Sequence, residues 1–118
     1  RIGRLIIPVG VAYGSDLEAT KEILEKAAAD HKSLVKNPAP SVLFRGLGDS
    51  SLDFELRCYL RDVDDMATTQ SDLLFQIYVD LSKAGIEIPF PQRDVNLRDF
   101  SNIRESPGSE QVDPTEGT

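Results

Sequence analysis

Residues 51–63, SLDFELRCYLRDV, alternate strictly between apolar and polar side chains. The apolar positions are Leu52, Phe54, Leu56, Cys58 and Leu60, and the positions between them are Asp53, Glu55, Arg57, Tyr59 and Arg61. Successive side chains of a strand point to opposite faces, so a period of two predicts a strand that buries one face only. We predict that this segment is the central strand of a small sheet, which the other apolar segments cover or extend.

Residues 4–13, RLIIPVGVAY, are rich in branched apolar side chains on both faces, which is typical of an interior strand. Pro8 has no amide hydrogen to donate to a neighbouring strand. Either its nitrogen faces a gap in the pairing, or the strand is broken near Pro8. Gly14 is expected to end the segment.

The spacing over residues 16–35 predicts a helix with one apolar stripe. The stripe recurs every three or four residues, at Leu17, Thr20, Ile23, Leu24, Ala27, Ala28, His31, Leu34 and Val35. Ser15 and Glu18 have the spacing of a capping box, which would start this helix. We therefore expect the helix to lie with its stripe on the sheet.

A hairpin is predicted next along the chain. Residues 41–45 read as a short strand with Val42 and Phe44 on one face. The turn GLGDS at residues 46–50 joins this strand to the central one, and Gly46 and Gly48 can take positive φ at little cost.

A second helix is expected to follow residues 62–72 and to end near Ala84, with Gly85 as its C-terminal cap. Its predicted core stripe consists of Leu74, Ile77, Leu81 and Ala84. Phe75 and Val79 lie on a different side, so the helix is either enclosed within the domain or covered by a partner. Residues 86–90, IEIPF, predict a last strand, and Pro89 suits an edge position.

The order strand, helix, strand, strand, helix, strand is that of a ferredoxin-like βαββαβ sandwich, an α+β fold. Right-handed crossovers would place both helices on one face of a four-stranded sheet. Charged side chains on the other face either contact solvent or meet a neighbouring domain. We predict one domain over residues 1–97, with a short extra C-terminal strand, and a disordered polar tail over residues 98–118 because that tail has few large apolar groups to bury.

Charge and composition exclude several functions. The net charge of -7 argues against binding to nucleic acid and to anionic membrane surfaces. The single cysteine, Cys58, excludes an intramolecular disulfide and favours a reducing compartment. The sequence has no run of about 18 apolar residues that could cross a bilayer. Because it begins with Arg1, we expect a piece of a longer protein.

The sequence offers few residues for chemistry, so we predict no enzyme, no cofactor and no metal. His31, the only histidine, lies on a helix stripe without Cys, Asp or Glu at metal-ligand spacing, so a half-buried structural role is favoured. Asp62, Asp64 and Asp65 are more typical of a solvated loop and cap than of a cation site. An acylphosphatase-type enzyme would need a phosphate-binding loop with an arginine before the first helix, and none is present.

Three blocks of sequence carry a family resemblance. They are VGVAYGSDLE at residues 9–18, GDSSLDFELRCYL at residues 48–60 and GIEIPFPQRDVNL at residues 85–97. In this order they resemble the cytoplasmic carboxyl-terminal domain of small-conductance mechanosensitive channels. The resemblance covers residues 4–97, and it does not include the pore helices or the β-rich middle domain of that family.

The resemblance implies a bacterial inner-membrane channel that releases ions and small osmolytes on hypo-osmotic shock, with this domain on the cytoplasmic side. Membrane contact would be made only by helices upstream of Arg1. Seven subunits would assemble, and this domain would form the lower part of a hollow cage. A strand of each subunit would join a parallel barrel at the cage floor, formed by Pro91, Gln92, Arg93, Asp94, Val95, Asn96 and Leu97.

Phe75 and Val79 would then contact the next subunit of the homo-oligomer. The alternative is a stand-alone ferredoxin-like regulatory domain that binds a small molecule on its open sheet face or at a dimer interface.

Overall fold

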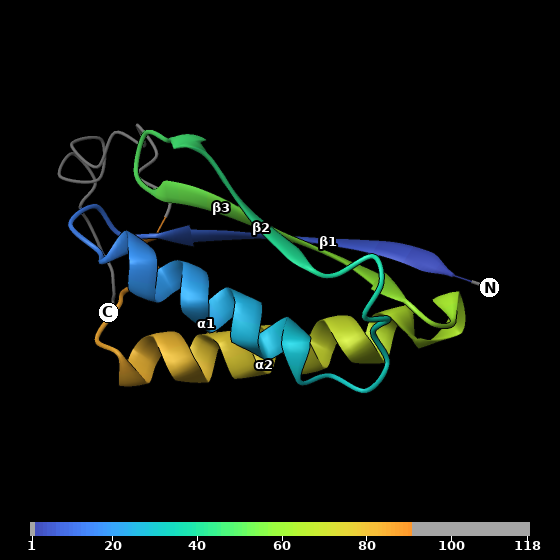
Figure 1. Ribbon diagram of the computed structural model, residues 1–118. Helices are drawn as coiled ribbons and strands as arrows, with labels where there is room; N and C mark the ends of the chain where they lie inside the picture. Colours follow the sequence, from blue (N-terminus) through green and yellow to red (C-terminus); the bar gives the residue numbers. More distant parts are fainter. Residues whose placement is uncertain (1, 91–118) are drawn as a thin grey trace, which may run out of the picture.

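The computed structural model describes residues 2–90. Within them the elements are β1 (Gly3–Val11), α1 (Leu17–Ala29), β2 (Ser41–Leu47), β3 (Leu52–Leu60), the 3-10 turn η1 (Val63–Asp65) and α2 (Met66–Lys83). The strands form one antiparallel sheet in the order β1-β3-β2. Both helices cover the same face of this sheet (Figure 1). The α+β class and the placement of both helices on one face are as predicted.

Strand β3 lies in the middle of the sheet, which confirms the prediction for residues 51–63. Its five apolar side chains are all buried, with Leu56, Cys58 and Leu60 fully so. The polar side chains between them are half-buried on the opposite face. The alternating pattern therefore sets both the position of β3 in the sheet and the face that meets the helices.

Strand β1 is an edge strand among the described residues, so the predicted interior position is wrong. It pairs only with β3, and it runs without a break from Gly3 to Val11. Its side chains alternate between buried and exposed. The amide of Ala12 donates to Glu87 O at 2.8 Å, away from β3. Because alternate backbone nitrogens of a strand point the same way, the nitrogen of Pro8 faces the same outer edge and β1 loses no bond to β3.

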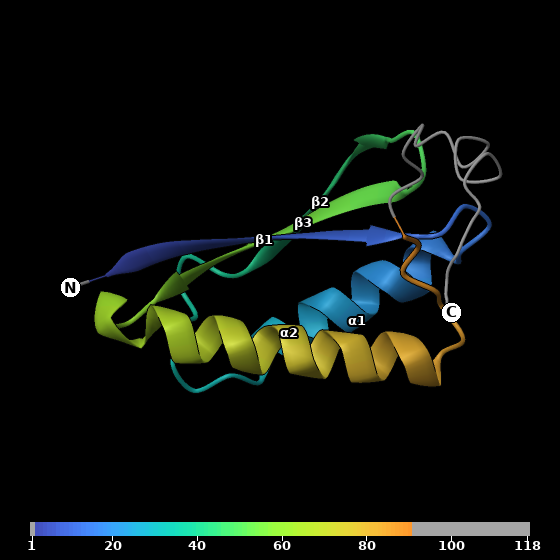
Figure 2. The same ribbon diagram turned by 180° about the vertical axis from the view of Figure 1, so that it is seen from behind.

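Residues 86–90 form no strand, so the predicted four-stranded sheet is reduced to three strands in the described part of the chain. Ile86 is buried, and the segment runs beside the C-terminal end of β1 (Figure 2). The hydrogen bond from the amide of Ala12 to Glu87 O joins the end of β1 to residues 86–90. Pro89 has no amide hydrogen, which limits any further pairing.

Helix α1 is shorter than predicted and starts one residue later. Asp16, rather than Ser15, caps it by accepting a hydrogen bond from the amide of Ala19 at 3.0 Å. The helix ends at Ala29 instead of residue 35. Beyond it the chain returns to the sheet, where the amide of Val35 donates to Tyr59 O at 2.8 Å. Leu34 is buried as predicted, but on an extended segment rather than on the helix.

Helix α2 ends as predicted, but it starts at Met66, inside the segment 62–72 that was expected to precede it, so the predicted start is wrong. Its buried face is also rotated from the predicted one. The buried residues are Thr69, Leu73, Ile77 and Leu81, whereas Leu74 and Ala84 are exposed. The amides of Gly85 and Ile86 donate to Ser82 O and Leu81 O, and Gly85 has φ +74°. This paired bonding with a left-handed glycine is a Schellman motif.

The hairpin between β2 and β3 forms as predicted, with Val42 and Phe44 on the side of the core. Neither Gly46 nor Gly48 has a positive φ, so their predicted role is wrong. Gly48 is needed for space instead, because a Cβ there would lie 2.6 Å from Asp53 Oδ2 and 3.0 Å from Ser51 O. The amide of Gly48 donates to Ser51 O and closes the turn.

Candidate assembly surfaces

One exposed side of helix α2 carries large apolar side chains and no charged residue. With 3.6 residues per turn, the residues opposite the α1 side form a single outer face. We call this the α2 face, and it consists of Ala67, Gln70, Ser71, Leu74, Phe75, Tyr78 and Ser82. Phe75 is 73% exposed and Tyr78 is 61% exposed. The acidic residues of the helix, Asp72 and Asp80, line a groove on the α1 side.

Phe75 and Val79 were predicted as interface residues on this helix. The structure places Phe75 on the α2 face, and it places Val79 half-buried on the neighbouring side. Leu74 and Tyr78 are the other large apolar side chains of the α2 face, and the sequence did not identify them as interface residues. Leu74 was predicted in the core from its spacing with Ile77 and Leu81, but the adjacent Leu73 has an equivalent spacing and is the one that faces inward.

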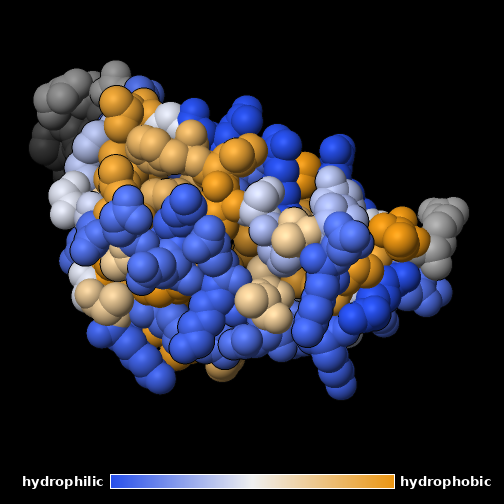
Figure 3. All heavy atoms as spheres, viewed as in Figure 1, coloured by the Kyte–Doolittle hydropathy of each residue, from blue (hydrophilic) through white to orange (hydrophobic). Residues whose placement is uncertain are grey.

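A second apolar area lies at the hairpin end of the molecule, on the side of β2 and α1. We call this the hairpin patch; its exposed members are Tyr13, Leu17, Phe44 and Leu47. The hydroxyl of Tyr13 donates a hydrogen bond to Gly48 O. The ring centroids of Phe44 and Phe54 lie 5.1 Å apart. Apolar atoms gather at this end in the surface view (Figure 3). The sequence did not identify the patch, because its residues come from two segments that lie about 30 residues apart.

The open face of the sheet carries an ion-paired carboxylate. Glu55 Oε2 accepts from Arg57 Nε, and Glu55 Oε1 lies 3.7 Å from Arg45 Nε. The hydrogen bond from Arg57 is the largest cause that lowers the pKa of Glu55 below its ordinary value of 4.5, and the charges of Arg57, Arg45 and Arg4 add to it. On this face Glu55 is therefore paired with two arginines.

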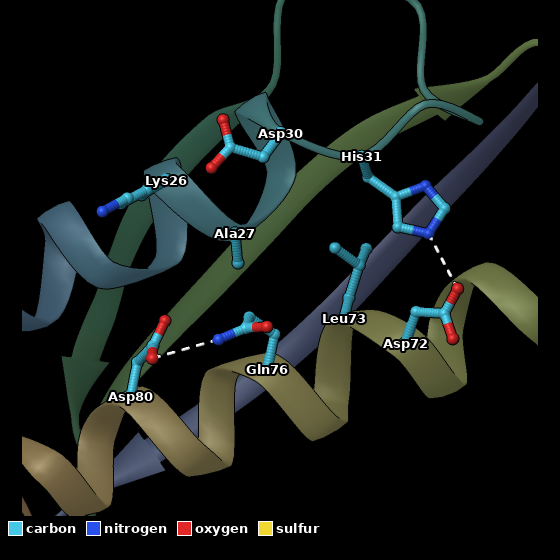
Figure 4. Close-up of a pocket in the computed structure, with 8 residues that line it drawn as sticks. All are labelled: Lys26, Ala27, Asp30, His31, Asp72, Leu73, Gln76 and Asp80. Carbon is cyan, nitrogen blue, oxygen red and sulfur yellow. Dashed lines mark hydrogen bonds and ion pairs between the residues drawn. The ribbon is translucent and has the colours of Figure 1, made fainter.

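A polar groove of about 340 Å³ separates the two helices (Figure 4). His31 Nε2 lies 2.9 Å from Asp72 Oδ2, and His31 Nδ1 accepts from the amide of Ser33 at 3.1 Å. Because an amide can only donate, Nδ1 carries no hydrogen, and Nε2 is the atom that donates to Asp72. His31 is half-buried as predicted, but it lies beyond the end of α1 rather than on the helix. The sequence could not identify its partner, which lies 41 residues away.

The remaining candidates serve the fold. Burial raises the pKa of the Cys58 thiol to about 11, so Cys58 is an unreactive core residue. Asp62 caps η1 by accepting from the amide of Asp64 at 3.0 Å, as the loop-and-cap interpretation predicted. Across residues 2–90, no group of three His, Cys, Asp or Glu side chains is placed to hold a metal ion. Pro91–Leu97 and the predicted tail lie outside the described residues.

Comparison with known proteins identifies the family. The family model described as "Mechanosensitive ion channel MscS, C-terminal" matches residues 5–88. The chain belongs to the MscS family of mechanosensitive ion channels. The MscS domain lies within the range of the predicted resemblance, residues 4–97.

Individual MscS-family proteins support this assignment. The chain is 42% identical over 94 residues to the mechanosensitive channel MscK of Escherichia coli, and 39% identical over 87 residues to an uncharacterized MscS family protein of Archaeoglobus fulgidus. These matches cover 80% and 74% of the chain. The closed-state crystal structure of Helicobacter pylori MscS superimposes with a TM-score of 0.71, at 29% identity and over 80% of the chain.

The chain is short beside these MscS-family proteins. It spans 8% of MscK, 30% of the Archaeoglobus protein and 37% of the Helicobacter chain. Between residues 2 and 90, no helix has the length and apolar character needed to cross a membrane.

Proposed function

We propose that this domain forms part of the cytoplasmic cage of a mechanosensitive channel. The observation that carries the proposal is the MscS C-terminal match over residues 5–88, together with the Helicobacter MscS structure that shares the fold. In this role the domain holds subunits together and lines the cage, while conduction belongs to the full-length parent. The parent would lie in a bacterial inner membrane and release ions and small osmolytes on hypo-osmotic shock.

The proposed assembly is a heptamer joined partly through residues 91–97. Phe90, the residue directly before this segment, is 85% exposed. A free strand needs a partner for its backbone groups. One strand from each of seven subunits would satisfy these groups in a parallel barrel, without an open edge.

Deleting residues 91–97 from the full-length parent tests the barrel. We expect the purified channel to lose its subunit stoichiometry or to dissociate at lower detergent or denaturant concentration, measured by light scattering. The matched control deletes seven residues of the tail, 105–111, and should leave the assembly intact. If both deletions leave stoichiometry and stability unchanged, the barrel assignment is wrong.

The channel function is tested in a bacterial strain that lacks its own mechanosensitive channels. The full-length parent should restore survival after a rapid drop in external osmolarity, and patch recordings should show openings that depend on membrane tension. A parent that is present in the membrane but neither protects cells nor opens under tension would contradict the proposed function.

A further inference from the structure

The two apolar surfaces lie on opposite sides of the domain. Helix α2 packs against β1, whereas α1 packs against β2 and β3. The ribbon views show α1 and β2 toward the viewer in Figure 1, and α2 and β1 toward the viewer in Figure 2. The α2 face therefore lies on the side of α2 and β1, and the hairpin patch lies on the opposite side, that of α1 and β2.

We propose that the α2 face of one copy docks on the hairpin patch of the next copy. This inference rests on the proposed assembly of subunits and specifies which surfaces meet. A contact between two different patches is head-to-tail, and it closes into a ring when the rotation allows. A two-fold dimer would instead need one patch that fits itself.

Charge favours a second copy as the occupant. Two chains with a net charge of -7 repel each other, so their contact is favoured where neither surface carries charge. The α2 face has no charged residue from Ala67 to Ser82, although a solvent-facing side of a helix is normally charged. Charge-depleted surfaces that contain aromatic residues, such as Phe75 and Tyr78 here, are typical of interface cores.

The number of large exposed side chains on each surface favours a contact within a larger assembly. A stable interface between two free proteins buries about 800 Å² on each partner. Each surface here offers three or four large exposed side chains, Leu74, Phe75 and Tyr78 on one and Tyr13, Leu17, Phe44 and Leu47 on the other. This contact would therefore act together with the other contacts of a ring.

Cysteine crosslinking in the full-length parent tests the proposal. Phe75→Cys is combined in turn with Leu47→Cys and with Tyr13→Cys, after other reactive cysteines outside this domain are replaced. Cys58 stays in place because it is buried. Mild oxidation should give a ladder of crosslinked subunits at least about ten-fold stronger than the control pair Phe75→Cys with Glu22→Cys, since Glu22 is exposed on α1.

The results separate this inference from the proposed function. An oligomer of intact mass without a ladder would overturn the head-to-tail contact alone, and so would Phe75→Cys subunits that crosslink to one another without a second cysteine. A parent that is monomeric by light scattering would overturn the proposed assembly itself. Truncation after residue 97 should leave the ladder unchanged; a ladder that appears only after truncation would show that the chain's own tail covers the α2 face.

Discussion

At the scale of single residues, the hairpin turn shows how two similar glycines have different roles. A Cβ at Gly48 would lie 2.6 Å from a carboxylate oxygen of Asp53, whereas a Cβ at Gly46 would meet nothing within 4 Å. Asp53 is also fixed by the hydroxyl of Ser51, which donates to its Oδ1 at 2.6 Å. The turn therefore depends on the absence of a side chain at one glycine only.

We predict that Gly48→Ala lowers the free energy of unfolding by about 1–3 kcal/mol, the usual cost of overpacking. Gly46→Ala is the matched control and should change it by less than about 0.5 kcal/mol. Urea denaturation of both variants measures the difference. Equal effects of the two substitutions would show that Gly48 is not required for space.

At the scale of elements, β3 could be predicted from the sequence because its pattern is local. Each apolar side chain of the strand has polar neighbours on both sides, so the buried face follows from a period of two. The C-terminal cap of α2 was equally local, since Gly85 follows the last helical turn. The predictions of a fourth strand and of the end of α1 were wrong, because both features depend on tertiary contacts. Val35 leaves the helix to bond to Tyr59, and residues 86–90 make one recorded backbone bond to the end of β1.

The assembly surfaces were only partly predictable for the same reason. The sequence identified Phe75 because a second apolar stripe runs along one helix. The hairpin patch joins Tyr13, Phe44 and Leu47, which become neighbours only when β2 pairs with β3 and Tyr13 bonds to Gly48.

The polar face of β3 gives a prediction about pH. The lowered pKa of Glu55 means that its contribution to stability is present above the ordinary carboxyl pKa of 4.5 and is lost as pH falls through the folded-state pKa. Glu55→Gln should therefore be less stable than wild type at pH 7, and the difference in unfolding free energy should narrow as the pH falls below 4.5. Chemical denaturation at several pH values measures it.

In a protein that carries Arg57→Gln, the further substitution Glu55→Gln should change the free energy of unfolding less than it does in wild type. The reason is that Arg57 donates the hydrogen bond that is the largest cause of the lowered pKa. A gap between wild type and Glu55→Gln that stays constant from pH 7 to pH 3 would contradict the assignment.

At the scale of the whole molecule, the two small surfaces predict how the isolated chain behaves. An interface well below about 800 Å² per partner dissociates at working concentrations unless other contacts support it. We expect residues 1–118 alone to sediment mainly as a monomer at micromolar concentration, and the full-length parent to form a stable ring. Sedimentation over a hundred-fold range of concentration checks this. A ring of the isolated chain whose mass does not depend on concentration would show that the domain carries most of the assembly energy.

The hydrogen bond from Ala12 to Glu87 also holds the segment after α2 beside the end of β1, which bears on how the domain responds to a mechanical load. The described chain enters at one end of β1, beside Gly3, and passes the other end of β1 after α2 (Figure 2). Between these points β1 spans about 27 Å, at roughly 3.3 Å per residue. A pull between the entry and exit of the chain acts along β1, so it loads the paired bonds to β3 together in shear instead of opening them one by one. We therefore expect the described part of the chain to resist extension along β1.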